Sequence, residues 1–198
     1  MKIAWPLLGA ALWAVAGCSP SAPAGGAVSS GGTPVPDPKA STPGNVATTP
    51  ERSSDESRVY ARKDLAVRNV TLAGKPFRLW IMDNGGKRQE GMMFLRDEDV
   101  AADQGMLFAF TDVQKGDQSH GFWMRNCPLA LDIVYLSPKN TVVNVGKGDP
   151  FNETTVPPAG DYKNVIELKQ GTAARIGLKP GMAVALPKDL KPVADDTL

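Results

Sequence analysis

The sequence predicts a mostly β fold: a small closed or nearly closed β-barrel or sandwich with one or two short helices, an α+β arrangement. Its apolar residues come in short runs of strand length. Gly, Pro, Asn and Asp separate these runs, as they do in turns. Eight short strands in one small domain also leave many exposed edges, and closure of the sheet is the usual way to hide them.

The expected strands follow one another along the chain. A turn at 73–76, which contains Gly74 and Pro76, joins the first two, and a tight turn at 137–140 makes a hairpin of the fifth and sixth. The eight runs cover residues 65–72, 77–82, 106–110, 121–125, 131–136, 141–145, 165–169 and 183–186.

Two short helices are expected between these strands. Asp83 and Asn84 are of the residue types that cap helix N-termini, and the turn or two after them runs to Met93. Thr172 is expected to cap a second helix over residues 173–176, which Gly177 would end in a left-handed conformation.

The first 17 residues predict a signal peptide. A positive Lys2 precedes about fourteen apolar residues, fewer than the roughly twenty that a membrane-spanning helix needs. Residues 15–18, VAGC, resemble the lipobox of bacterial lipoproteins, which makes Cys18 the expected lipidation site. The alternative is ordinary cleavage after Ala16, which would release a soluble secreted protein.

These features divide the chain into four parts. Residues 1–17 are the signal peptide, and residues 18–57 are a Ser-, Pro-, Gly- and Ala-rich tether that is expected to be disordered, with a reach of roughly 35 Å. Residues 58–187 are the β domain, and residues 188–198 are a C-terminal tail. The expected location is the bacterial envelope, extracytoplasmic and anchored by lipid at Cys18. Ser19 in place of Asp favours an outer membrane, facing the periplasm, in a Gram-negative host.

Charge and residue types exclude several function classes. Lys and Arg total 22 against 21 for Asp and Glu, which disfavours a nucleic-acid partner. The methionines at 92, 93, 106 and 124 stand in apolar runs, so we interpret them as core rather than as copper ligands. His120 and Cys127 would lie about 20 Å apart on a straight strand, too far for a catalytic pair. We therefore expect no catalytic residue, metal or cofactor.

Six blocks resemble one known family in their order and spacing. They are GMMFLR from Gly91, GMLFAF from Gly105, FWMRN from Phe122, LDI from Leu131, IEL from Ile166 and GTAARIGL from Gly171. Together they resemble DUF192, the uncharacterised ACR family, over roughly residues 65–186. The resemblance implies a small domain without an established activity. Arg125, Cys127 and Met182 stand where the family usually has Lys, Thr and Asp.

The candidate ligand-binding residues are Trp123, Arg125, Asn126 and Asp132. An indole beside a guanidinium and a carboxamide suits a sugar ring or a peptide, whereas the structural alternative pairs Arg125 with Asp132 and buries Trp123. The expected function is a non-enzymatic, membrane-tethered binding or accessory domain for a glycan or protein segment. A hydrolase that uses Asp132 and a structural partner in an envelope complex are the alternatives. Carboxylate pairs could also form among residues 90, 132, 149, 153 and 167.

Overall fold

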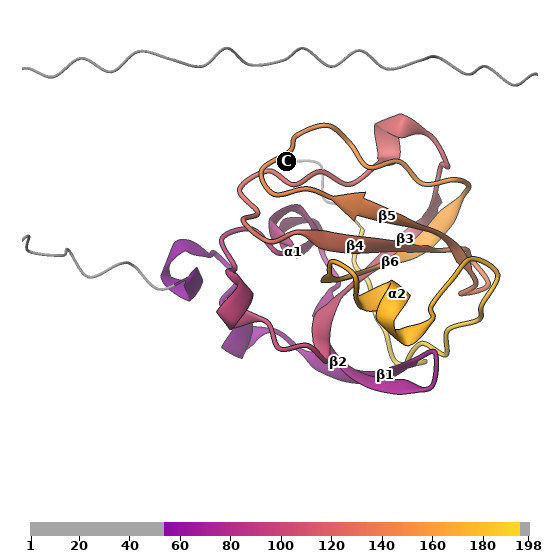
Figure 1. The fold of residues 1–198 in the computed structure, drawn as a ribbon, viewed down its shortest axis with the longest axis horizontal. Coiled ribbons are helices and arrows are strands. Elements are labelled where there is room, and N and C mark those ends of the chain that lie inside the picture. Colours follow the sequence, from indigo (N-terminus) through magenta and orange to yellow (C-terminus); the bar gives the residue numbers. More distant parts are fainter. Residues whose placement is uncertain (1–53, 195–198) are drawn as a thin grey trace, which may run out of the picture. The chain divides into compact units, whose positions relative to one another are not determined.

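Six strands form one sheet in the computed structural model, which describes residues 54–194 (Figure 1). The strand order is β1-β2-β3-β6-β4-β5, and every neighbouring pair is antiparallel except β2 and β3, which are parallel. The strands are β1 (Val67–Leu72), β2 (Lys75–Met82), β3 (Gln104–Gln114), β4 (Leu131–Leu136), β5 (Val142–Gly148) and β6 (Tyr162–Lys169). The mostly β prediction is confirmed, and six of the eight expected runs are strands.

The parallel pair requires a crossover, which the short helix α1 (Gly85–Glu90) begins. The Asn84 side chain caps α1 by accepting the backbone N–H of Lys87 at 2.9 Å, as the sequence predicted. The helix ends at Gly91, which has φ +44° and ψ −128°. The 3-10 helix η3 (Asp97–Asp99) then leads the chain toward β3.

The second helix, α2 (Thr172–Ile176), follows β6 and ends at the left-handed Gly177, as expected. Its cap differs from the prediction. Gly171, rather than Thr172, is the N-cap residue, and it has no side chain that could accept a hydrogen bond. The carboxylate of Asp132, on β4, accepts the backbone N–H of Ala173 instead.

Two expected strands and the closure of the sheet need correction. Residues 121–125 form only one isolated bridge, between Phe122 and Val156, because a turn with a left-handed Asn126 interrupts the segment. Residues 183–186 also form only isolated bridges, from Ala183 to Thr141 and from Ala185 to Thr71. The edge strands β1 and β5 do not pair with each other, so the described sheet is open rather than a closed barrel.

The C-terminal segment 181–185 nevertheless covers parts of both edges. On the β5 side it exchanges backbone hydrogen bonds with Val142 and donates one from Val184 to Asn140. On the β1 side it reaches Thr71 through the bridge to Ala185. The segment therefore covers parts of both outer strands, while the six-stranded sheet itself stays open.

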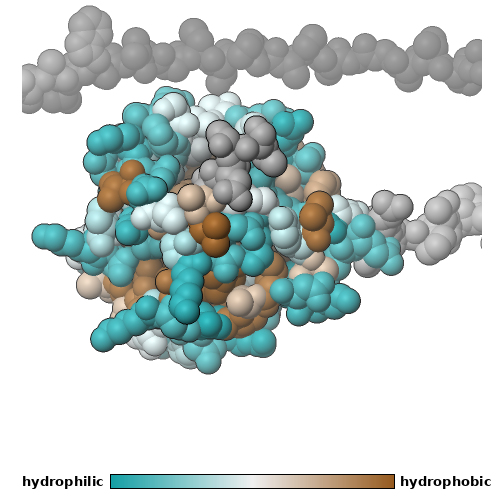
Figure 2. Space-filling view, turned by 180° about the vertical axis from the view of Figure 1, so that it is seen from behind, coloured by the Kyte–Doolittle hydropathy of each residue, from teal (hydrophilic) through white to brown (hydrophobic). Residues whose placement is uncertain are grey.

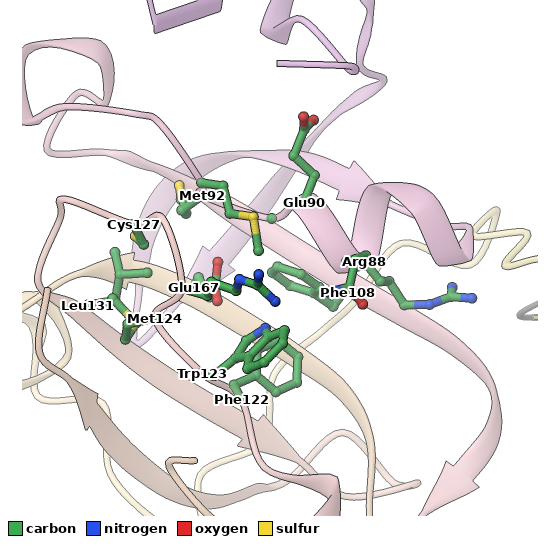
Figure 3. Close-up of a pocket in the computed structure, with 14 residues that line it drawn as sticks. Arg88, Glu90, Met92, Phe108, Phe122, Trp123, Met124, Cys127, Leu131 and Glu167 are labelled. Atoms are coloured by element: carbon green, nitrogen blue, oxygen red, sulfur yellow. The ribbon is translucent and has the colours of Figure 1, made fainter. Parts of the chain in front are cut away.

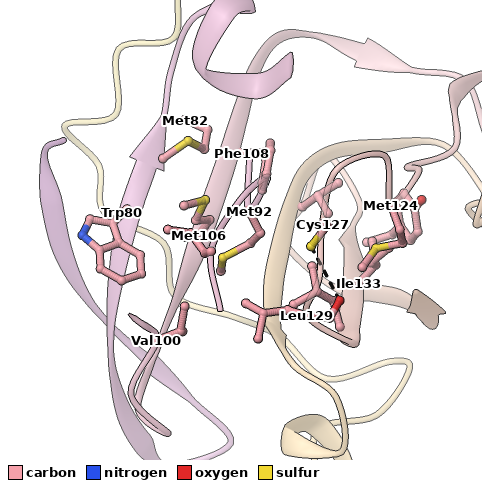
Figure 4. Packing of buried hydrophobic residues seen from close by; sticks show 14 of the residues in the cluster. Trp80, Met82, Met92, Val100, Met106, Phe108, Met124, Cys127, Leu129 and Ile133 are labelled. Carbon is pink, nitrogen blue, oxygen red and sulfur yellow. Dashed lines mark hydrogen bonds between the residues drawn. The ribbon is translucent and has the colours of Figure 1, made fainter. Parts of the chain in front are cut away.

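Both faces of the sheet are buried. The first core lies on one face and is rich in aromatic and sulfur-containing side chains (Figure 4). The second core lies on the other face and is covered by α2 and the segment after it. The first core comprises Leu65, Trp80, Met82, Met92, Leu95, Val100, Met106, Phe108, Met124, Cys127, Leu129, Leu131, Ile133, Tyr135, Tyr162 and Val165. The second comprises Val70, Leu72, Phe77, Leu79, Ile81, Leu107, Val134, Leu136, Val142, Ile166, Leu168, Ala173, Leu178 and Val184.

Most of the predicted N-terminal features lie outside the described residues. These are the signal peptide at 1–17, Cys18 and the tether as far as residue 53. The last four residues of the expected tether form the 3-10 helix η1 (Ser54–Ser57), in which Asp55 pairs with Arg62 at 3.0 Å. Among residues 54–194, no helix is long and apolar enough to cross a membrane.

Candidate functional site

A small pocket of about 30 Å³ opens over the first core, between α1 and the loop at 121–127 (Figure 3). Its lining is mostly apolar and includes three aromatic rings and several methionines. Of its two buried carboxyl groups, Glu90 and Glu167, that of Glu167 lies at the centre of the pocket in Figure 3. The lining residues are Arg88, Gln89, Glu90, Gly91, Met92, Met93, Phe108, Phe122, Trp123, Met124, Arg125, Cys127, Leu131 and Glu167.

Strand alternation places Glu167 in the pocket. Val165, two residues earlier on β6, belongs to the first core, whereas Ile166 and Leu168 belong to the second. Glu167 therefore points to the first core, where it is only 4% exposed. Its Oε2 atom is buried without a hydrogen-bond partner in the described part of the chain. Burial raises the pKa of Glu167 to about 8, although the Arg58 charge and a backbone hydrogen bond from Met92 lower it.

Gly91 leaves room beside this carboxyl group. A Cβ at position 91 would lie 3.1 Å from the Phe108 ring and 3.5 Å from Glu167 Oε2. Residues other than glycine also rarely adopt the φ of +44° found at Gly91. The end of α1 therefore needs glycine both for its backbone and for the space next to Glu167.

The second carboxylate at the pocket, Glu90, has its hydrogen bonds satisfied. It accepts the backbone N–H groups of Val59 at 2.6 Å and Tyr60 at 3.0 Å, and it pairs with Arg58 at 3.2 Å. In Figure 3 its carboxylate points away from Glu167. Glu90 thus holds the segment 58–60 against α1, and Glu167 is left as the acidic group inside the pocket.

The loop that forms the other wall is fixed at several points. Phe122 exchanges backbone hydrogen bonds with Val156 and donates its N–H to the Tyr135 hydroxyl at 3.0 Å. Met124 donates to the Asn152 carbonyl at 2.9 Å. The Phe122 ring meets Phe108 edge-to-face at a centroid distance of 5.0 Å. Because neighbouring segments hold the loop, the pocket is already formed without a ligand.

Trp123 and Arg125 lie together at the pocket, as the sequence predicted for side chains that share a face. Trp123 is 37% exposed, and the Arg125 guanidinium lies over its ring, 5.5 Å from the centroid. This arrangement is a cation–π contact at a partly exposed rim. Trp123 and Arg125 lie in a loop rather than in a strand. Buried and exposed side chains alternate along this loop as they would in a strand, but its backbone at these residues does not pair with the sheet.

Asn126 and Asp132 do not line this pocket. Asn126 is an exposed turn residue whose carbonyl accepts the N–H of Phe94 at 2.8 Å. Asp132 is buried next to α2, on the face opposite Glu167, and accepts from Ala173 at 2.8 Å. The structure therefore brings together two of the four candidate residues and separates Asp132 from them by the thickness of the sheet.

Cys127 lies in the pocket wall and His120 does not. The Cys127 thiol donates to the Leu129 carbonyl at 3.6 Å (Figure 4), and burial, together with the nearby Glu167, raises its pKa to about 12. His120 contacts Asp117 at 2.8 Å on the surface. No cluster of three His, Cys, Asp or Glu residues suited to a metal occurs within residues 54–194.

Comparison with known proteins identifies the family. The model of DUF192, described as an uncharacterized ACR, matches residues 68–186. The chain belongs to this family. The DUF192 domain therefore carries the pocket, with Gly91, Phe108 and Glu167 inside the matched range. No curated protein matches the chain.

Two solved structures are similar to this DUF192 protein. A candidate transcription regulator from Sinorhizobium meliloti 1021 is 28% identical, with a TM-score of 0.51 over 61% of this chain and 94% of that one. A protein of unknown function from Novosphingobium aromaticivorans DSM 12444 is 27% identical, with a TM-score of 0.53 over 69% of this chain and 98% of that one. These two proteins therefore share the fold of this chain.

Sequence reasoning did not single out Glu167, Gly91 or Glu90 as site residues. A signal for Glu167 was present, because an acidic residue between Ile166 and Leu168 in a run of apolar residues indicates a carboxyl group buried on a strand. The role of Gly91 follows from a positive φ and a close contact, and neither can be read from composition.

Proposed function

We propose that this protein is a membrane-tethered, non-enzymatic binding domain of the bacterial envelope, with Cys18 as its lipid attachment site. The pocket beside Glu167 would receive a small group of an extracytoplasmic ligand, either a glycan or a protein segment. Trp123 and Arg125 would contact the part of the ligand that remains outside. Asn126 and Asp132, the other two residues expected from the sequence, would support the loop and α2.

One observation carries the binding proposal. The buried Oε2 atom of Glu167 has no hydrogen-bond partner among residues 54–194, although buried polar atoms in folded proteins nearly always have one. The atom lies in a preformed pocket with an aromatic side chain at its rim, which is the usual composition of a ligand site. A ligand that donates a hydrogen bond would give Oε2 the partner that it lacks.

Binding is favoured over catalysis by the state of the titratable groups. The Cys127 thiol, with a pKa of about 12, is protonated at neutral pH and is a weak nucleophile in that form. Asp132, the residue that a hydrolase was expected to use, is occupied with the backbone of α2 on the other face of the sheet. Glu90, the other carboxylate in the lining, is occupied by Val59, Tyr60 and Arg58, so it is not available to share an acid–base role with Glu167.

The remaining alternative, a structural partner, receives less support, and so does the role that one similar structure suggests. A structural partner should present a large apolar patch, whereas the apolar residues on the face in Figure 2 are interrupted by hydrophilic ones. A transcription regulator, as the Sinorhizobium meliloti protein is described, should carry an excess of basic residues, and this chain has a net charge of only +1.

The anchor is supported by the VAGC motif at residues 15–18 and is tested separately from the pocket. Cells that express the wild-type protein or Cys18→Ala are labelled with a radioactive fatty acid and fractionated. The wild-type protein should carry label and remain with membranes, whereas the variant should carry none and leave them. Retention of the unlabelled variant in membranes would contradict the tether.

The pocket is tested by hydrogen exchange on the full chain, with and without a purified extract of envelope glycans and peptides. Amides of residues 88–93 and 122–125 should exchange more slowly with the extract. The same extract should not protect them in Trp123→Ala. Protection elsewhere on the domain, with none at the pocket, would place the binding site on another surface.

A further inference from the structure

We propose that the group received by the pocket is the ammonium of a lysine side chain, presented by a protein segment. This inference rests on the proposed binding function and adds the chemistry of its ligand. Four observations support it: the acidic oxygen without a partner, the aromatic lining, the size of the pocket and the distribution of charge around it.

In its ionised form, the oxygen requires a hydrogen-bond donor. Glu167 Oε2 is buried and without a partner, while the neighbouring carboxylate of Glu90 is occupied by Val59, Tyr60 and Arg58. An ionised carboxylate only accepts hydrogen bonds, and a charged donor gives it the stronger ones. The pocket therefore contains one acidic acceptor, and an ammonium group is the donor that also neutralises its charge.

The lining favours a cation over a neutral donor. Phe108, Phe122 and Trp123 supply three aromatic rings around Glu167 (Figure 3). The electron-rich faces of such rings attract cations, most strongly where water is excluded. A hydroxyl group could also donate to Glu167, but it would gain nothing from the rings beyond contact.

The size of the pocket favours lysine over an amino sugar. A volume of about 30 Å³ holds one or two groups of the size of water. The tip of an alkyl chain fits this volume, whereas a sugar ring does not. A Cβ at Gly91 would narrow the space beside Oε2 further. A slender side chain can reach Glu167 while the peptide that carries it lies across Trp123.

The groups that face Glu167 leave its charge available to a ligand. Arg58, from the N-terminal segment, pairs with Glu90 at the end of α1 and lowers the pKa of Glu167 through its charge. Arg88 of α1 also lines the pocket, and its guanidinium donates to the Ala109 and Val193 carbonyls. Cys127, from the loop, and Tyr135, from β4, are held in their uncharged forms because burial raises the pKa of each. Arg125 lies over Trp123 at the rim. An entering ammonium would thus meet an acid whose Oε2 atom has no hydrogen-bond partner among residues 54–194.

Binding should release a proton. Without a ligand, Glu167 is mostly protonated at pH 7 because its pKa is about 8. The lysine ammonium enters charged, the Glu167 carboxyl loses its proton to the buffer, and an ion pair forms in the pocket. Affinity should therefore rise with pH up to about 8, with a difference of about 50-fold between pH 6 and pH 8.

Isothermal titration calorimetry on the full chain in detergent tests the proposal, with the peptide acetyl-Gly-Lys-Gly-amide as the probe. The comparison ligands are the same peptide acetylated on its lysine, methylammonium chloride and glucosamine. We expect the lysine peptide to bind, with close to one proton released at pH 7 in buffers of different ionisation heat. Methylammonium should bind more weakly with the same proton release, and the acetylated peptide should not bind.

Two variants complete the experiment. Glu167→Gln keeps the shape of the side chain and should weaken binding at least tenfold and abolish the proton release. Glu98→Gln makes the same chemical change at an exposed position and should leave the binding affinity and the proton release unchanged. Equal binding of the free and acetylated lysine peptides, or unchanged binding by Glu167→Gln, would overturn the inference. The peptide comparison still decides the matter if Glu167→Gln does not fold.

The results also separate this inference from the proposed function. If glucosamine binds and the lysine peptide does not, the ammonium of a glycan replaces that of a protein segment and the proposal is wrong. If neither binds while an envelope extract still protects residues 122–125 from exchange, the lysine inference fails and the binding function remains supported.

Discussion

The carboxylate of Asp132 accepts the backbone N–H of Ala173 at 2.8 Å, which links strand β4 to the first turn of α2. The N-cap residue of α2 is Gly171, which has no side-chain acceptor, and Asp132 supplies one from a neighbouring strand. A residue that looked like a site candidate in the sequence thus stabilises a helix terminus. The finding explains why a buried acid is tolerated at this position.

Asp132→Ala should destabilise the domain by about 1 to 3 kcal/mol, because the Ala173 N–H loses its buried acceptor. Asp132→Asn retains an oxygen that can accept and should cost less. Urea denaturation followed by circular dichroism measures both. Equal losses for the two variants would mean that charge, rather than the hydrogen bond, is what α2 requires.

Trp123→Ala should have little effect on stability, because the side chain is 37% exposed at the rim of the pocket. Trp80→Ala is the matched control, since Trp80 is only 8% exposed and belongs to the first core. The control should cost about 3 to 5 kcal/mol. Thermal melts of the two variants compare them directly, and a similar loss for both would make Trp123 a core residue rather than a recognition residue.

Stability should fall as pH rises from about 5 to about 8, because of Glu167. Its pKa is about 8 in the folded domain and near 4.5 in the unfolded chain, so the unfolded state binds fewer protons in this range. Glu167→Gln should remove this pH dependence and raise the free energy of unfolding by about 2 to 4 kcal/mol at pH 7. Urea denaturation of the wild-type protein and of Glu167→Gln at several pH values tests this prediction. Glu98→Gln should keep the wild-type slope, and a flat wild-type profile would contradict a buried, protonated Glu167.

Arg58→Ala should free the segment 54–60 from α1. The buried Arg58 donates to the Met93 carbonyl at 2.6 Å and pairs with Glu90, and its removal leaves that carboxylate without its cation. A loss of about 3 to 5 kcal/mol is expected. Hydrogen exchange of residues 54–60 should become faster. Arg68→Ala removes an exposed ion pair with Asp189 and should cost under about 1 kcal/mol.

The strands could be predicted because local residues determine them. The run 131–136 is apolar except for Asp132 and is buried at every position, which matches a strand between the two cores. The loop at 121–125 shows the limit of this reasoning. Its alternating pattern is typical of a strand, but it arises because Phe122 and Met124 pack into the first core while Trp123 and Arg125 face outward.

The site could be predicted only in part, because it depends on contacts between distant segments. Trp123 and Arg125 are neighbours in sequence, and their shared location followed from spacing. Glu167 approaches them only through the order of the strands, and Gly91 only through the crossover from β2 to β3. Which carboxylate faces the pocket and which one caps a helix depends on register, and a single sequence does not reveal it.

The connection that residues 181–185 make between β1 and β5 has a consequence for synthesis. Thr71 leaves the ribosome early, and its bridge partner Ala185 is among the last residues of the domain to be made. Until then both outer strands expose backbone groups that other chains could pair with. The two outer strands can be covered only after residues 181–185 have been synthesised. The new domain therefore depends on this late segment to protect its edges from pairing with other chains.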